Sequence, residues 1–316
     1  MEKSNECNVK KSEILFLYET SYNVPNGDPF TGEQRYDDET KKILVSDARI
    51  KRFIRTYMED VKGLPIYVSG NSGNKDAKKR IEELAKVSSS TDIGEILKEQ
   101  IDVRLFGGIS TLDDKPKFDK KEYSNGHVQF TGPVQFALLN PSLNKVDLRM
   151  HQNTSHFTSG DNKTQGAIAT TTVVPYSVMQ IHGWINPKVA ETTGCTEEDI
   201  RLMFQALWNG TNGEGSSFSR SKVGQDSLLM LQIVYKGDAS KLYGVDRLIK
   251  LKSKESDKKE EQFRSMDDYE LDFDGLKKIV GDSRIEAIYY YTELEDITQK
   301  LIGEKFQKMD FTAKNK

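Results

Sequence analysis

The chain has little cysteine, almost no net charge and no long apolar run. Its two cysteines, Cys7 and Cys195, are far apart in the 316 residues, which excludes a disulfide framework and a cysteine-rich zinc site. No stretch reaches the roughly 18 consecutive apolar residues that a membrane helix needs. The first residues also lack the apolar core of a signal peptide, so we expect a cytoplasmic protein with no membrane partner.

The weak net charge limits how the chain could bind nucleic acid. Its 46 lysines and arginines oppose 49 aspartates and glutamates, which gives a formal charge of −3 and a pI of about 6.0. Binding through bulk positive charge is therefore excluded, and any nucleic acid must be held by local basic patches.

Catalytic signatures are scarce as well. His151 and His156 are five residues apart, which does not place both on one face of a helix, and no H-E-x-x-H motif occurs. The glycine-rich residues 209–215 follow a predicted helix and lack the Lys-Ser/Thr ending of a phosphate loop. The acidic turn at 37–39 is compatible with a metal, but a solvated turn is the commoner explanation. We therefore expect no catalytic residues, no metal site and no cofactor.

The strongest periodic segments follow the order strand, helix, strand, strand, helix, strand. The first helix is predicted over residues 47–60, because Ser46 is a favourable N-cap and apolar residues recur at helical spacing. The second is predicted over 197–208, where Thr196 and Asp199 form a capping pattern. The expected strands are residues 13–20, 127–139 (as a pair or a bent strand), 172–185 and 227–235. This order is that of a ferredoxin-like or RRM-type α+β sheet, a fold that many unrelated functions share.

Long polar segments separate or follow these elements. Residues 70–120 are polar and mixed, with two expected helices, and residues 64–69 before them fit a short strand. Residues 140–170 have few aliphatic side chains and are too long for an idle loop. Residues 252–262 alternate in charge, which is typical of a mobile stretch.

The first helix carries a local basic patch. Residues 41–55 contain six basic residues against one acid. Four of the basic side chains lie on the predicted helix: Arg49, Lys51, Arg52 and Arg55. Such a cluster on an acidic protein suits a phosphate backbone, although a solvated helix face explains it about as well.

A second patch precedes the last expected strand of the sheet. It runs from Ser219 through Arg220 to Lys222 and alternates hydroxyl and cationic side chains. Both kinds of side chain bind phosphate oxygens, so this segment is a further candidate for RNA contact. Its alternative is a plain surface loop.

Four short segments resemble those of a known family. They are residues 23–28 (NVPNGD), 44–55 (LVSDARIKRFIR), 102–107 (DVRLFG) and 219–225 (SRSKVGQ). Each is short, but their joint order and spacing over much of the chain is specific. In these segments the chain resembles the CRISPR-associated Cascade backbone subunits, the seventh Cas family, and most closely the type I-B branch.

The resemblance implies a modified RRM palm with two insertions. The palm would comprise residues 1–69, 121–139 and 171–250, with helical fingers at 70–120 and a thumb loop at 140–170. Residues 251–316 would form a C-terminal extension that packs on the palm.

The resemblance also implies which residues contact RNA. By position, Ser46, Lys51 and Arg52 match the guide-contacting start of a helix, and Arg220 and Lys222 match a basic loop near the RNA. Arg49 and Arg55 complete the predicted contact set. The thumb has no matching motif, so its candidates for wedging at a flipped nucleotide are only expectations: Met150, Phe157 and Gln165.

A non-catalytic role in antiviral defence is implied. Several copies would lie head to tail on one guide RNA (crRNA), together with other Cascade subunits, and would present the guide to target DNA. Phosphate and sugar contacts suffice for this role, because base pairing itself reads the target. An ordinary RRM would instead carry aromatic RNP motifs on its central strands, and this chain lacks them.

Two other functions stay open at the level of sequence. A metal-dependent ribonuclease of RRM-like fold would use Asp28, Asp37 or His151. A stand-alone regulatory RNA-binding protein would bind as a monomer or dimer, with base preference. Incubation with RNA and Mg²⁺ or Mn²⁺ tests the first, and mass measurement on a long RNA tests the second.

Overall fold

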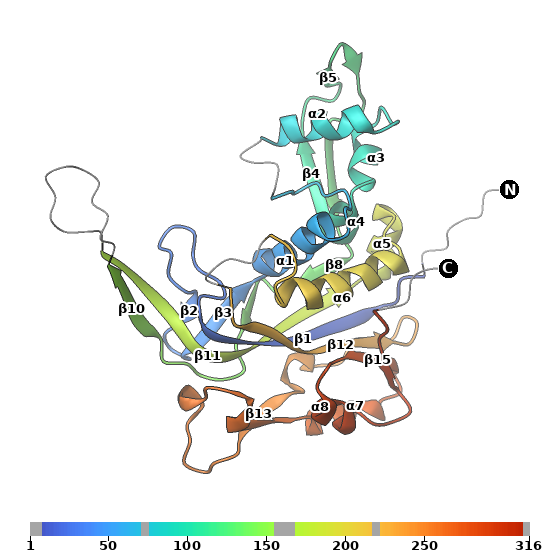
Figure 1. Ribbon diagram of the computed structural model, residues 1–316. Helices are drawn as coiled ribbons and strands as arrows, with labels where there is room; N and C mark the ends of the chain where they lie inside the picture. Colours follow the sequence, from blue (N-terminus) through green and yellow to red (C-terminus); the bar gives the residue numbers. More distant parts are fainter. Residues whose placement is uncertain (1–7, 71–75, 155–167, 217–221, 312–316) are drawn as a thin grey trace, which may run out of the picture.

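The computed structural model describes residues 8–70, 76–154, 168–216 and 222–311, and its centre is a mixed β-sheet (Figure 1). Within these residues the largest sheet has seven strands, in the order β10-β11-β1-β12-β15-β16, with β8 also paired to β11. The strands are β1 (Ser12–Asn23), β8 (Val134–Phe136), β10 (Arg149–Thr154), β11 (Ile168–Ile185), β12 (Gln225–Tyr235), β15 (Ile285–Tyr291) and β16 (Phe306–Lys308). The β15–β16 pair is parallel and the other pairs are antiparallel.

Strand β1 is buried on both faces. Phe16 and Tyr18 point into one hydrophobic cluster, and Leu15 and Leu17 point into another. Successive side chains of a strand alternate between the faces of its sheet, so a strand covered on both sides is a continuous apolar run. The sequence EILFLYET at residues 13–20 is such a run.

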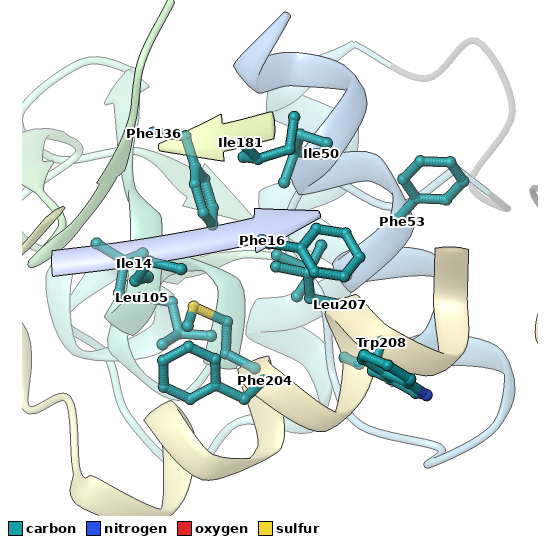
Figure 2. Close-up of a cluster of buried hydrophobic side chains, with 14 of the residues drawn as sticks. Ile14, Phe16, Ile50, Phe53, Leu105, Phe136, Ile181, Phe204, Leu207 and Trp208 are labelled. Carbon is teal, nitrogen blue, oxygen red and sulfur yellow. The ribbon is translucent and has the colours of Figure 1, made fainter. Parts of the chain in front are cut away.

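Helices α1 (Asp47–Asp60) and α6 (Glu197–Thr211) cover one face of the sheet. Both begin where the caps predict: the Ser46 hydroxyl accepts a hydrogen bond from the amide of Arg49, and Thr196 and Asp199 form a reciprocal capping box. Figure 2 shows the resulting core, in which side chains from both helices meet those of the sheet.

The C-terminal segment covers the opposite face. It contains β13 (Lys250–Ser253), β14 (Tyr269–Asp272), α7 (Asp274–Val280), α8 (Glu295–Lys300) and the 3₁₀ turns Val245–Arg247, Glu260–Gln262 and Met266–Asp268. Phe263, Tyr269 and Leu276 are buried against the sheet residues Leu15 and Leu231. Both faces of the sheet are therefore covered.

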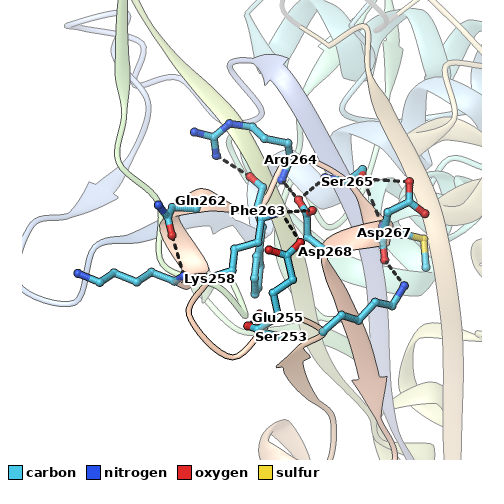
Figure 3. A network of polar contacts seen from close by, with 12 residues as sticks. Ser253, Glu255, Lys258, Gln262, Phe263, Arg264, Ser265, Asp267 and Asp268 are labelled. Atoms are coloured by element: carbon cyan, nitrogen blue, oxygen red, sulfur yellow. Dashed lines mark hydrogen bonds and ion pairs between the residues drawn. The ribbon is translucent and has the colours of Figure 1, made fainter.

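Residues 252–262 are ordered, so the expectation of a mobile stretch was wrong. The Nζ of Lys258 lies 2.6 Å from Oδ1 of Asp268, and the Asp268 carboxylate also accepts from the amides of Arg264 and Ser265 (Figure 3). One carboxylate thus ties this segment to the chain that follows it. The neighbouring Phe263 anchors the segment in the core.

A third, smaller hydrophobic cluster lies beyond α1. Its elements are α2 (Ala77–Val87), α3 (Ile93–Lys98), α4 (Ile101–Phe106), β4 (Gly107–Thr111), β5 (Lys117–Phe118), β6 (Lys121–Glu122) and β7 (His127–Thr131). Buried residues such as Ile81, Leu97 and Tyr123 form its core. Because β7 pairs with β4 and Val128 packs on this cluster, residues 121–131 belong with it, whereas we had expected them in the palm.

The short strand expected at 64–69 does not form. The amides of Tyr67 and Val68 donate to the carboxylate of Asp102, and the Arg80 guanidinium donates to the carbonyls of Ile66 and Tyr67. Side chains therefore satisfy the backbone groups that a neighbouring strand would have satisfied.

A hairpin of β10 and β11 projects from the central sheet (Figure 1). Residues 174–185 of β11 pair with β1, whereas residues 168–173 pair with β10. Beside its base, β2 (Tyr36–Asp37), β3 (Lys42–Ser46) and β9 (Leu139–Pro141) form a small sheet, and α5 (Pro187–Thr193) follows β11. Within the described residues, no helix is both long and apolar enough to cross a membrane.

Candidate nucleic-acid interface

Three of the four segments noted in the sequence meet at the C-terminal end of β1. The side-chain Oδ1 of Asn26 accepts a hydrogen bond from the backbone amide of Ser46 at 2.6 Å. The backbone amide of Asn26 donates to Gln34 Oε1 at 2.9 Å. The loop after β1 is therefore bonded directly to the N-cap of α1. We call the place where residues 23–26, 46–49 and 222–225 meet the junction.

The segment before β12 closes the junction. The Nζ of Lys222 donates to the carbonyl of Val24 at 2.6 Å, and Asn23 Nδ2 donates to the carbonyl of Val223 at 2.8 Å. Gly224 has φ +85°, and a Cβ there would lie 2.7 Å from the Ser21 carbonyl oxygen. Glycine is required because the two backbones approach so closely.

Arg49 lies in the junction, and no carboxylate of the described residues pairs with it. Its Nε and Nη2 atoms are buried and have no hydrogen-bond partner among the described residues, while its guanidinium carbon is 3.9 Å from the centre of the Phe53 ring. Burial lowers the pKa of Arg49 to about 10, despite the Tyr18 hydroxyl nearby. That hydroxyl is also buried without a partner in the described chain.

Lys222 is the second buried cation. Burial, and then the positive charge of Arg49, lower the pKa of Lys222 to about 7. Both side-chain polar atoms of the neighbouring Gln225 are buried without a described partner. Buried charges are normally paired. Two adjacent cations with no carboxylate bonded to either of them in the described residues are chemically suited to an anion.

Arg52 extends this positive surface along α1. Its guanidinium lies against the backbone of Gly70, where any added Cβ would collide with it. The positive charge of Arg52 also contributes to the lowered pKa of Arg49. No ion pair engages Arg52 within the described chain, so its charge adds to that of the junction.

The other two helix cations are engaged in the protein. Lys51 Nζ lies 3.0 Å from Oδ2 of Asp47. Arg55 Nε lies 2.9 Å from Oδ2 of the fully buried Asp102. Asp102 belongs to residues 102–107, the one segment noted in the sequence that does not reach the junction. Arg55 thereby holds α1 against α4. Its contacts are those of a structural residue.

The remaining predicted residues divide into two groups. Met150 lies on β10 and is 80% exposed, so the hairpin presents an apolar side chain to solvent. Arg220, Phe157 and Gln165 lie outside the described residues.

The acids of the ribonuclease alternative have local partners. Asp28 accepts from the amides of Phe30 and Thr31 and pairs with Arg35 at 3.0 Å, and these backbone bonds lower its pKa. Asp37 accepts from the hydroxyl and amide of Thr40. In the described parts of the chain, no three histidines, cysteines or acids are arranged so that they could hold a metal ion.

Sequence reasoning missed three residues at or beside the junction. Tyr18 lies inside an apolar run and has no local signal, and Gln225 closes a recognised segment that was read only for its basic and hydroxyl side chains. Asn26 belongs to a recognised segment, but its bond to Ser46 depends on the tertiary fold.

The family model described as "CRISPR-associated protein Cas7" matches residues 10–274. The chain belongs to the Cas7 family. It is 26% identical, over 309 residues and 88% of each chain, to a CRISPR-associated protein Cas7 of Haloferax volcanii. The family recognised from four short segments is thereby confirmed.

The fold has a counterpart among solved structures. A chain of a "CRISPR RNA-guided surveillance complex, pre-nicking" superposes with a TM-score of 0.52 over 95% of this Cas7 protein and 96% of that chain. At 12% identity this likeness concerns the fold alone. The α+β architecture with its central mixed sheet is thus one that occurs in such complexes.

Proposed function

We propose that this Cas7 protein is a non-catalytic crRNA-binding subunit that forms the backbone of a Cascade-type complex, with type I-B as the closest branch. The observation that carries the proposal is the junction, where the partly buried Arg49 lies beside the buried Lys222 and no carboxylate of the described residues is bonded to either. An RNA phosphate supplies the missing negative charge. Family membership and the likeness to a chain of an RNA-guided surveillance complex support the same function.

The chemistry of the junction suits a guide. Arginine, lysine and backbone amides bind phosphate oxygens whatever the base sequence, and this leaves the bases free to pair with target DNA. A protein that must carry any guide needs such sequence-independent contacts. The ribonuclease alternative has no comparable observation behind it, so we propose that the bound guide remains intact.

The fold supports an RRM-like palm with the RNA on an unusual side. Strands β8, β11, β1 and β12 are adjacent in that order, and α1 and α6 cover one face. An ordinary RRM stacks bases on the other face, but here the C-terminal segment buries that face. The RNA would therefore lie at the strand ends and the start of α1.

The projecting units fit the roles of fingers and thumb. We assign the fingers to residues 70–131, which include the third hydrophobic cluster, and the thumb to the hairpin within 140–170. Head-to-tail copies and other Cascade subunits would contact these projections.

A filter-binding titration with crRNA tests the proposal. The double variant Arg49→Gln/Lys222→Gln is expected to bind crRNA at least tenfold more weakly and with a shallower dependence on salt, because phosphate contacts release counterions. Lys277→Gln/Lys278→Gln on α7 removes the same charge from the far layer and serves as the matched control. Equal losses in both variants would refute a localised site. Intact RNA after incubation with Mg²⁺ or Mn²⁺ is expected, and cleavage would restore the ribonuclease alternative.

A further inference from the structure

Tyr22 has an unusual backbone conformation at the edge of the junction. Its φ is +47°, although it lies in β1. The other described non-glycine residues with positive φ are Lys41, Asp119, Lys120 and Asn125, and all lie outside strands. A bulky side chain rarely adopts this conformation, because the Cβ approaches its own carbonyl oxygen.

Burial does not compensate for this strain. The Tyr22 side chain is 67% exposed, so the ring gains little from packing inside the protein. A glycine at this position would fit the backbone without cost. Strained residues of this kind cluster at functional sites, where the surrounding structure holds them in place.

The segment before β12 holds Tyr22 in place. The amide of Ser21 donates to the Gly224 carbonyl at 2.8 Å, and Asn23 Nδ2 donates to the Val223 carbonyl. Tyr22 is therefore fixed from both sides to the segment that carries Lys222. Val223 is itself 61% exposed, so two apolar side chains border the buried cations of the junction.

We infer that Tyr22 is a stacking platform for a nucleobase of the bound RNA, directly beside the phosphate held by Arg49 and Lys222. This inference rests on the proposed function. Proteins that bind single-stranded nucleic acid combine cations for the backbone with aromatic rings for the bases. Here Tyr22 supplies the aromatic ring and Lys222 supplies the cation, on two segments that are bonded to each other.

The position of the ring favours RNA over a protein partner. The residues on either side of Tyr22 are bonded to Gly224 and Val223, which directly follow Lys222, so a guide phosphate bound at Lys222 would bring its own base within reach. Stacking accepts every base, since each has a π face. The platform would therefore hold any guide without selecting its sequence.

Three variants test the role of the ring. Tyr22→Gly removes both, Tyr22→Phe keeps the ring, and Tyr243→Ala is the control because Tyr243 is 88% exposed on the C-terminal layer. The probes are a short single-stranded RNA and the same RNA with abasic nucleotides. Loss of one stacked base is expected to weaken binding of the normal RNA by roughly 5- to 150-fold in Tyr22→Gly. Tyr22→Phe and Tyr243→Ala are expected to bind like the wild type.

The abasic RNA gives the deciding comparison. Tyr22→Gly should bind it as the wild type does, whereas Arg49→Gln/Lys222→Gln should bind both RNAs weakly. The melting temperature of Tyr22→Gly should not fall, because glycine relieves the strain. Normal affinity of Tyr22→Gly for the short RNA would overturn the inference, and a defect confined to assembly on long RNA would assign the ring to a protein contact instead. Failure of the wild type to bind either RNA would refute the proposed function itself.

Discussion

The Arg55 guanidinium and the Asp102 carboxylate form an ion pair, 2.9 Å from Nε to Oδ2, in which the acid is fully buried. The same carboxylate accepts from the amides of Tyr67 and Val68. It thus joins α1, α4 and the connection between α1 and α2. Two segments that the sequence shares with its family are therefore connected by one interaction.

Asp102→Ala is expected to destabilise the protein by about 3 kcal/mol or more, because it leaves a largely buried guanidinium and two amides without partners. Thermal or urea unfolding measures the loss. Lys51→Gln, which removes a partly buried i,i+4 pair with Asp47 one turn away on α1, should change stability by only about 0.5 kcal/mol. A similar loss in both variants would mean that the Asp102 pair has no special structural role. Charge reversal at Arg55 should unfold the protein as well, because it would place a second negative charge against the buried Asp102.

Lys222 predicts a pH dependence of stability. Its pKa is about 7 in the folded protein, against an ordinary value of 10.5. Between these values the unfolded chain binds more protons, so the free energy of unfolding should rise with pH from about 7 to 10. The informative quantity is the difference between wild type and Lys222→Met, because Lys42 is also shifted downward by burial. Parallel profiles for the two proteins would contradict the assignment.

RNA binding should show the opposite trend. The phosphate requires protonated Lys222, so crRNA affinity should decrease as pH rises above 7, and RNA binding near neutral pH should take up protons from the buffer. Calorimetry in buffers of different ionisation enthalpy measures that uptake. Lys222→Met should abolish the pH-dependent part, and uptake that persists in this variant would point to another group.

Gly224→Ala should disturb the junction without affecting the core. A Cβ would lie 2.7 Å from the Ser21 carbonyl oxygen, at a φ of +85° that alanine adopts poorly. We expect weaker crRNA binding and a lower melting temperature. Gly237→Ala, also at positive φ but with open space around it, controls for the conformational cost alone. Equal effects would show that the close approach to β1 is unimportant.

Removal of the β10–β11 hairpin should separate folding from assembly. Replacing residues 150–172 by a short Gly-Ser turn leaves the pairing of β11 with β1 at residues 174–185 intact. The shortened protein is expected to stay folded, to bind short RNA and to lose regular assembly on long RNA, measured by mass photometry or sedimentation. Loss of the folded state would mean that the hairpin belongs to the core.

The helices were predictable because their signals are local. Ser46, Thr196 and the apolar stripes of α1 and α6 lie within the segments whose structure they determine. The junction was predictable only as separate basic patches, because burial depends on the tertiary fold. The sequence cannot distinguish Arg49, whose Nε and Nη2 are buried with no partner among the described residues, from Arg55, which is paired with a residue of α4. The order in residues 252–262 depends on Asp268 and Phe263, which lie outside that segment.

The double burial of β1 has a consequence for synthesis of the protein. Thr20 pairs with Gln225, and Leu15 and Leu17 are covered by the C-terminal segment. The face of β1 that carries Leu15 and Leu17, and the edge that pairs with β12, therefore stay uncovered until the residues after 224 have been made. Such non-local pairing folds slowly and exposes apolar surface meanwhile. The nascent chain should consequently depend on chaperones, and prematurely terminated chains should be recognised and degraded.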